Sequence, residues 1–191
     1  MTKIKKIITA SMAYALCAIA LSSAQASKNL VNIATINIEK IQQESIMGKA
    51  LNDQCTAKRE KIQEELQSKM MKIQQKATAL QNNSAALSKS AKDKQMAELQ
   101  QEHSSVMAAG EKALYSINEV FSLSRQKMVE TISQLSQKAA SKKKIDLVMV
   151  SSAIVYVNDK TSEDITDEIM DMLNNKYKKV DYSKYLDEIS I

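Results

Sequence analysis

The sequence predicts an α+β fold, with a long antiparallel helical hairpin that projects like a tentacle from a small β-stranded body. Three observations predict it. The 191 residues include no Pro, two Gly and one Phe, and such a composition favours long exposed helices over a core of large side chains. Apolar residues recur with a helical period through the middle of the chain. Segments rich in β-branched residues flank that stretch on both sides.

Residues 1–26 have the pattern of a cleavable secretory signal. Three lysines precede an apolar run, Ile7 to Leu21, and Ala24-Gln25-Ala26 places small residues where a signal peptidase cuts. The run is shorter than the roughly 20 residues that span a bilayer, so a membrane anchor is the weaker interpretation. We expect export and cleavage after Ala26. Losing the three lysines lowers the net charge from +5 to +2, so the basic balance does not indicate a nucleic-acid partner.

Residues 27–45 form the first part of the predicted body. The segment from Leu30 to Ile38 is rich in β-branched residues and predicts a strand. Its alternation of apolar and polar residues is imperfect, which favours a strand buried on both faces. A short helical turn, Glu39 to Glu44, is expected to follow it.

The outgoing helix of the hairpin is predicted to begin at about Ile46. Its seam residues recur at intervals of 11 and are Leu51, Cys55, Ile62, Leu66, Ile73 and Ala77. An 11-residue repeat corresponds to about 3.67 residues per turn, so this stripe stays on one side of a nearly straight helix. So narrow a stripe fits against one partner helix rather than a broad core.

The chain is expected to reverse near residues 82–90, so that residues 46–141 form the hairpin. Asn82-Asn83-Ser84 interrupts the helical pattern, and Ser90 with Asp93 fits a capping box. The alternative is one uninterrupted helix of roughly 145 Å. The return helix is predicted from about Ala91 to Ser141. Its seam residues are Leu114, Ile117, Phe121, Met128, Ile132, Leu135 and Ala139.

Residues 142–176 are predicted to complete the body. Lys142-Lys143-Lys144 would end the return helix, where cations oppose the negative end of its dipole. Two strands, Ile145–Val150 and Ala153–Val157, would form a β-hairpin. Asp164 would then cap a helix. The apolar face of that helix consists of Ile165, Ile169, Met172 and Leu173. Residues 177–191 form a polar tail to which the pattern assigns no structure. Because three short strands leave open edges, we expect copies of the chain to cover them in a symmetric homo-oligomer.

Residues suited to catalysis or metal binding do not cluster in this sequence. The one histidine, His103, has no cysteine or acidic cluster at ligand spacing, and the acids around Asp164 lack the central glycine of a calcium loop. We expect no enzymatic activity, no metal and no cofactor. Cys55 is the one thiol left after cleavage, and it is either a buried seam residue, which we favour, or an intermolecular or redox bridge.

Charge is segregated along the chain. Leu66 to Ala97, around the expected tip, carries six lysines and one acid, whereas Asp159 to Ile191 carries nine acids and five lysines. Lysines beside flexible thioethers suit a surface that accepts many apolar partners, although ordinary solvated lysines are the alternative interpretation. The candidate binding residues at the tip are Lys69, Met70, Met71, Lys72, Ile73, Lys76, Leu80, Leu87, Lys89, Lys92, Lys94 and Met96.

These features resemble the Skp/OmpH family of periplasmic chaperones over nearly all of the chain from Ser27 to about Lys176. The motifs that carry the resemblance are Glu39-Lys40-Ile41-Gln42-Gln43 after the first strand, Ile145–Val148, Ala153–Tyr156 and Asp164-Ile165-Thr166. The resemblance implies a periplasmic homotrimer in which strands form a central barrel and three hairpins surround a cavity. Unfolded outer-membrane β-barrel proteins would be held there without ATP.

The resemblance also indicates which residues would join the subunits. The candidate trimerisation residues are Ile33, Ile36, Leu147, Val148, Ile154 and Val155. The tail from Tyr177 to Ile191 is longer than the family pattern, and the arms are less basic, so no lipopolysaccharide site is carried over. An anionic membrane lipid surface is a further expected contact, and nucleic acid is not. A structural coiled-coil spacer or adaptor of the cell envelope is the alternative function.

Overall fold

The computed structural model describes residues 31–83, 87–156 and 162–191. Asn32–Ile191 forms one compact unit, and the fold described below is that of this unit. The predicted signal segment and its cleavage after Ala26 lie outside the described residues. In the part of the chain that is described, no helix is long and apolar enough to cross a membrane.

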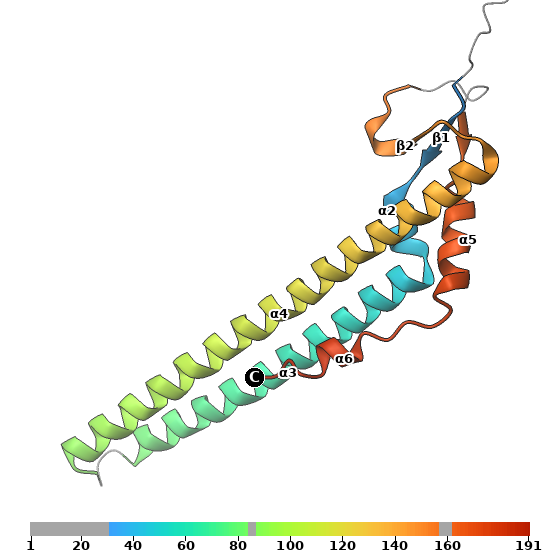
Figure 1. Ribbon diagram of the computed structural model, residues 1–191. Coiled ribbons are helices and arrows are strands. Elements are labelled where there is room, and N and C mark those ends of the chain that lie inside the picture. The colour runs from blue at the N-terminus through green and yellow to red at the C-terminus, as the bar shows by residue number, and fades with distance from the viewer. Residues whose placement is uncertain (1–30, 84–86, 157–161) are drawn as a thin grey trace, which may run out of the picture. The chain divides into compact units, whose positions relative to one another are not determined.

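The unit is mostly helical and is dominated by a long helical hairpin beside a small parallel sheet (Figure 1), which confirms the predicted fold class. The elements in chain order are β1 (Ile33–Ile36), α2 (Ile38–Glu44), α3 (Ile46–Asn82), α4 (Lys89–Lys143), β2 (Leu147–Val150), the 3-10 turn η2 (Ser151–Ala153), β3 (Ser162–Asp164), α5 (Thr166–Lys176) and α6 (Ser183–Leu186). At 1.5 Å per residue, α3 is about 55 Å long and α4 about 80 Å.

The sheet has the strand order β2-β1-β3, and both outer strands run parallel to β1. Parallel neighbours need a long crossover connection, and the hairpin itself provides it between β1 and β2. The predicted strand over Ala153–Val157 is wrong for its described part, because Ser151–Ala153 forms a 3-10 turn and the chain then leaves the sheet. The polar segment Ser162–Asp164 takes the second edge of β1 instead.

A single serine separates α2 from α3. Ser45 ends α2 with its backbone N–H on Ile41 O, and its hydroxyl accepts the Gly48 N–H at 3.1 Å, which starts α3. The two helices meet so closely that a Cβ on Gly48 would lie 1.9 Å from the carbonyl oxygen of Gln42. Only glycine fits at this position, and the junction therefore fixes how the hairpin leaves the sheet.

The seam of the hairpin follows the predicted stripe on α3. The buried apolar residues of α3 are Met47, Leu51, Cys55, Ile62, Ile73 and Leu80, and those of α4 are Ala113, Ile117, Met128, Ile132, Leu135 and Ala139. Leu114 was expected in the seam but is 37% exposed, and Ala113 takes its place. Small residues are needed here because the helices approach closely: a Cβ on Gly110 would lie 2.6 Å from Leu66 Cδ2.

The two ends of α4 are both capped. Its N-cap is Ser88, whose hydroxyl accepts the Ala91 N–H at 3.3 Å, so the predicted cap at Ser90 is wrong by two residues. The helix ends in Lys142 and Lys143, as predicted, and Lys144 follows in the left-handed region with φ 56°. Its backbone N–H bonds to Ala140 O, which satisfies one of the last free carbonyls.

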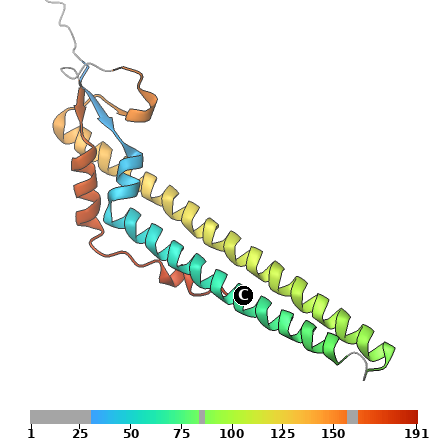
Figure 2. The same ribbon diagram turned by 180° about the vertical axis from the view of Figure 1, so that it is seen from behind.

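The residues from 177 to 191, here called the tail segment, return along the hairpin (Figures 1 and 2). Tyr182 and Leu186 are buried, and Ile189 and Ile191 pack against the same core. Sequence patterning gave this segment no structure, because its apolar residues follow no helical or strand period. Its conformation depends on contacts with α3 and α4.

Candidate functional site

The described residues hold no group of three or more His, Cys, Asp or Glu side chains that could bind a metal. Cys55 is a free thiol buried in the seam, as predicted, and burial raises its pKa. A raised pKa keeps this thiol protonated and unreactive. The functional site was therefore sought among exposed surfaces rather than in a catalytic pocket.

The lysines of the expected tip differ in their surroundings. Lys76 Nζ lies 2.7 Å from Glu102 Oε2 across the hairpin, and Lys94 Nζ lies 4.0 Å from Glu98 Oε1. Lys69 Nζ donates to the backbone oxygen of Ile191 at 2.6 Å. Within the described residues, the remaining tip lysines make no ion pair; they are Lys72, Lys89 and Lys92.

The apolar residues named with these lysines divide into two groups. Met71 and Met96 are exposed, and Met70 and Leu87 are half-buried. Ile73 and Leu80 instead pack in the seam between α3 and α4, so they are not surface residues of the protomer. A binding role for the exposed members stays a prediction.

One row of exposed apolar residues was not predicted, and it lies on α4. It consists of Met96, Met107, Leu114 and Val129, here called the apolar stripe. The intervals of 11, 7 and 15 residues are close to whole numbers of helical turns, so the four side chains share one side of the helix. The sequence carried this signal, but we had assigned Leu114 to the seam. Contiguous exposed apolar surface marks a site of interaction.

The apolar stripe leads toward a groove at the base of the hairpin. This groove, of about 480 Å³, lies between α4 and the strands β1 and β2. Val129 of the stripe lines it. The other apolar lining residues include Ile36, Ile132, Ile145, Leu147, Val148 and Val150. An uncovered apolar surface therefore extends from the arm to the sheet.

The candidate trimerisation residues lie around the sheet, and their exposure differs. Leu147 and Val155 are exposed, whereas Ile36 is buried within the protomer. Ile33, Val148 and Ile154 are half-buried. Tyr156, which was not named as a candidate, is also exposed. Whether these residues join subunits stays a prediction.

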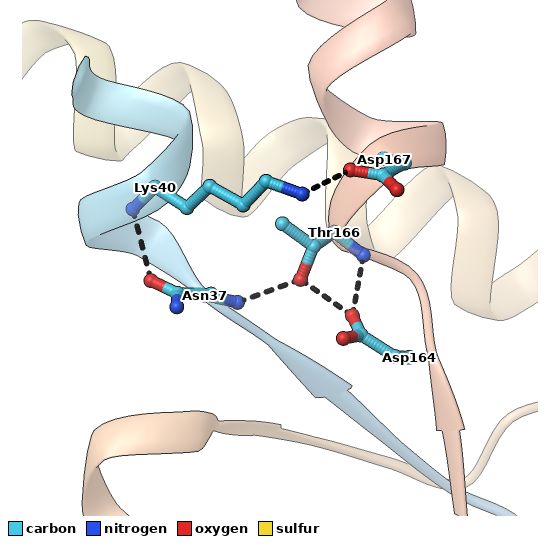
Figure 3. Close-up of polar contacts among 5 residues, drawn as sticks. All are labelled: Asn37, Lys40, Asp164, Thr166 and Asp167. Carbon is cyan, nitrogen blue, oxygen red and sulfur yellow. Dashed lines mark hydrogen bonds and ion pairs between the residues drawn. The ribbon is translucent and has the colours of Figure 1, made fainter. Parts of the chain in front are cut away.

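A polar network fixes α5 against β1 and α2 (Figure 3). Thr166 Oγ1 accepts the Asn37 N–H at 2.9 Å and donates to Asp164 Oδ1. Asp164 Oδ1 also accepts the Thr166 N–H at 2.8 Å, so Asp164 serves the start of α5 from the end of β3. Lys40 Nζ lies 2.8 Å from Asp167 Oδ1, and the hydrogen bond with that carboxylate raises the pKa of Lys40.

A second ionic cluster fastens the end of α4 to the same region. Lys143 Nζ forms ion pairs with Glu163 of β3 and with Glu168 of α5, at 2.7 Å for the latter. Hydrogen bonds with Glu163 and then Glu168 raise the pKa of Lys143. The acids around Asp164 were expected to complement a helix dipole. They also tie three elements of the body together, so they have a structural role.

Comparison with known proteins identifies two similarities. The sequence model of a family described as "Outer membrane protein (OmpH-like)" matches residues 32–173. The fold is similar to the crystal structure of a Caulobacter crescentus CB15 protein assigned as an OmpH-like outer membrane chaperone, with a TM-score of 0.73 and 17% sequence identity. That alignment covers 80% of this chain and 89% of the other, and at this identity it shows a shared fold. No curated protein matches the chain.

Proposed function

We propose a function on the premise that this chain belongs to the OmpH-like outer membrane protein family, a family of chaperones without enzymatic activity. The chain is proposed to act in the periplasm as an ATP-independent holdase. It would bind unfolded outer-membrane β-barrel proteins, prevent their aggregation and aid their delivery to the outer membrane. Its predicted signal segment is consistent with export to that compartment.

The apolar stripe on α4 is the observation that carries the proposal. Met96, Met107, Leu114 and Val129 expose apolar surface along an arm about 80 Å long, without forming an enclosed pocket. Flexible methionines adapt to many partner shapes, and unfolded chains expose apolar side chains without a fixed geometry. Many weak contacts spread along the arm suit such clients better than one shaped site.

The basic tip would add long-range attraction. Lys72, Lys89 and Lys92 are exposed near the point where the chain reverses. Exposed charges raise the rate of encounter more than the final affinity, and salt screens them over about 8 Å at physiological ionic strength. Replacing these three lysines with Gln should slow the capture of an acidic client and flatten its salt dependence. The amount bound at equilibrium should change little.

Self-association as a homotrimer through the sheet end is part of the proposal. Leu147, Val155 and Tyr156 expose large apolar side chains there, and the groove beside Val148 is lined mainly by apolar residues. Exposed strand edges and apolar side chains of this kind are usually covered by another chain. Three arms held at one end would then enclose a space in which the apolar stripes are available to a client.

The holdase proposal is tested by diluting a urea-unfolded β-barrel protein into buffer with the chain and following light scattering. Met107→Gln with Leu114→Gln should weaken the suppression of aggregation. The matched control is Tyr115→Gln with Leu123→Gln, which also removes two exposed apolar side chains from α4 but leaves the stripe intact. Equal effects of the two pairs would show that the stripe is not the client surface. A structural spacer would not suppress aggregation at all.

A further inference from the structure

The tail segment is held on the hairpin by backbone contacts. The Gln54 side chain donates to Val180 O at 3.2 Å and accepts the Tyr182 N–H at 2.7 Å. Lys69 Nζ donates to Ile191 O at 2.6 Å. These three contacts reach main-chain atoms, so they would hold any extended peptide placed in the same way. In between, the segment forms a single helical turn, α6.

Apolar side chains of the tail segment occupy hollows on the hairpin. Leu186 lies with Ala57, Lys58 and Lys61 of α3 in one hollow. Ile189 and Ile191 lie in another, over a part of α4 built from small residues. The small residues that line it are Ala109, Ala113 and Ser116. The tail segment therefore fills a groove that extends over both helices.

This groove lies on the opposite flank of α4 from the apolar stripe. Residues two positions apart in an α-helix are rotated by about 200° around the axis. Lys112 and Ser116, which line the groove, each stand two positions from Leu114 of the stripe. The groove is therefore separate from the client surface proposed above.

The groove is imperfectly matched to the tail segment it holds. Tyr182 is 5% exposed, and among the described residues its hydroxyl has no hydrogen-bond partner. A buried hydroxyl without a partner costs free energy that a phenyl ring would not. The site is thus suited to an aromatic ring, but it has no group to satisfy the tyrosine oxygen. A foreign segment with phenylalanine at this position would compete well with the chain's own tail.

We propose that this groove is a peptide-binding site whose resident ligand is the chain's own tail segment. Its ligand in trans is an extended segment of an unfolded client, with an aromatic residue in the Tyr182 position and an aliphatic residue four positions later. The backbone anchors give tolerance of sequence, and the two buried side chains give preference. The identity of the client rests on the proposed function; the groove itself does not.

The test measures binding of a fluorescein-labelled peptide of residues 178–191 to the full chain by anisotropy. Tyr182→Ala loosens the resident tail, and Tyr185→Ala is the matched control, because Tyr185 is 56% exposed. Since a docked tail lowers the fraction of open groove, the Tyr182→Ala protein should bind the peptide about tenfold more tightly than wild type. The Tyr185→Ala protein should behave as wild type. If Tyr182→Ala loses helical circular dichroism, Leu186→Asp takes its place.

Peptide variants and a groove variant locate the contact. A peptide carrying Tyr182→Phe should bind more tightly than the natural sequence, and one carrying Leu186→Asp should not bind. Adding Gln54→Ala to the Tyr182→Ala protein should weaken binding, because the backbone anchor is lost. Equal affinity of all proteins for the peptide, or no effect of Gln54→Ala, would overturn the groove as a site.

Competition experiments identify the ligand. A urea-unfolded β-barrel protein should displace the labelled peptide from the Tyr182→Ala protein, and failure to do so overturns the client as ligand. Displacement by unlabelled wild-type chain instead would mean that copies exchange tails, which overturns it too. Aggregation suppression without any peptide binding would remove the groove and leave the holdase function. Peptide binding without suppression would remove the holdase function and leave the groove.

Discussion

Replacing Gly48 with alanine should damage the protein at the point where the hairpin joins the body. The added methyl would lie 1.9 Å from Gln42 O, a backbone atom, and 3.2 Å from the Ser45 hydroxyl. No side-chain rotation can relieve the contact with Gln42, so α2 and α3 must move apart. Overpacking costs roughly 1–3 kcal/mol, and a backbone clash belongs at the top of that range or above. The gain of about 1 kcal/mol in helix propensity offsets part of it.

Gly110→Ala is the internal control for this reasoning. Its Cβ would also come too close, at 2.6 Å, but to the terminal methyl Cδ2 of the half-buried Leu66 side chain. A rotamer change of Leu66 costs about 0.5–1.5 kcal/mol, which the helix propensity of alanine roughly cancels. The expected changes in the free energy of unfolding are therefore a loss of about 2 kcal/mol or more for Gly48→Ala and near zero for Gly110→Ala.

Urea unfolding followed by circular dichroism at 222 nm, at one protein concentration, separates the two variants. With a dependence on urea of roughly 2 kcal/mol per molar, Gly48→Ala should lower the midpoint by about 1 M. Gly110→Ala should unfold within a few tenths of a molar of wild type. Equal midpoints for Gly48→Ala and wild type would refute the view that this junction is fixed by close backbone contact.

Three further predictions follow from the seam, the tail segment and the sheet. Cys55→Ala should cost on the order of 1–2 kcal/mol of unfolding free energy, and the buried Cys55 thiol should react with a thiol reagent only after unfolding; quantitative intermolecular disulfides on non-reducing gels would contradict this. Burial raises the pKa of Tyr182 to about 12 from 10.0, so the folded chain keeps a proton that the unfolded chain loses. Stability should be complete below pH 10 and fall as pH rises toward 12, and Tyr182→Phe should lack this component in alkaline urea titrations. Val148→Asp should dissociate the proposed trimer by light scattering, whereas deleting 70–107, facing stretches of α3 and α4, should not.

The sequence predicted the hairpin because one physical signal dominates it. The repeat of Leu51, Cys55, Ile62 and Ile73 depends on helical geometry alone, and all four residues are buried as expected. The same reasoning failed at Leu114, since it selects the largest apolar residue in reach. Where two helices approach closely, the contact instead selects small residues, and Gly110 and Ala113 face the partner helix.

The sheet and the tail segment could not be predicted in the same way. Residues 153–156 are suited to a strand, but strand propensity does not identify the partner strand. The edge of β1 is taken by Ser162–Asp164, which is held there by its links to α5, including the hydrogen bond of Ile165 N to Thr35 O at 3.0 Å. Burial of Tyr182 likewise depends on Gln54, a residue 128 positions away, and no local pattern in the sequence indicates that contact.

The distribution of apolar side chains on α4 argues that its exposed surface is selected for function. A hairpin of two helices can bury only a narrow stripe on each, so other apolar residues on α4 must be covered by something else or stay exposed. On one flank, the tail segment covers the groove between the helices. On the other flank, Met107 and Leu114 stay exposed in the protomer. If exposure were only a by-product of a thin seam, polar residues would serve there at no cost to the hairpin. Apolar residues at these positions gain stability only when a partner covers them, whether a client or another copy of the chain.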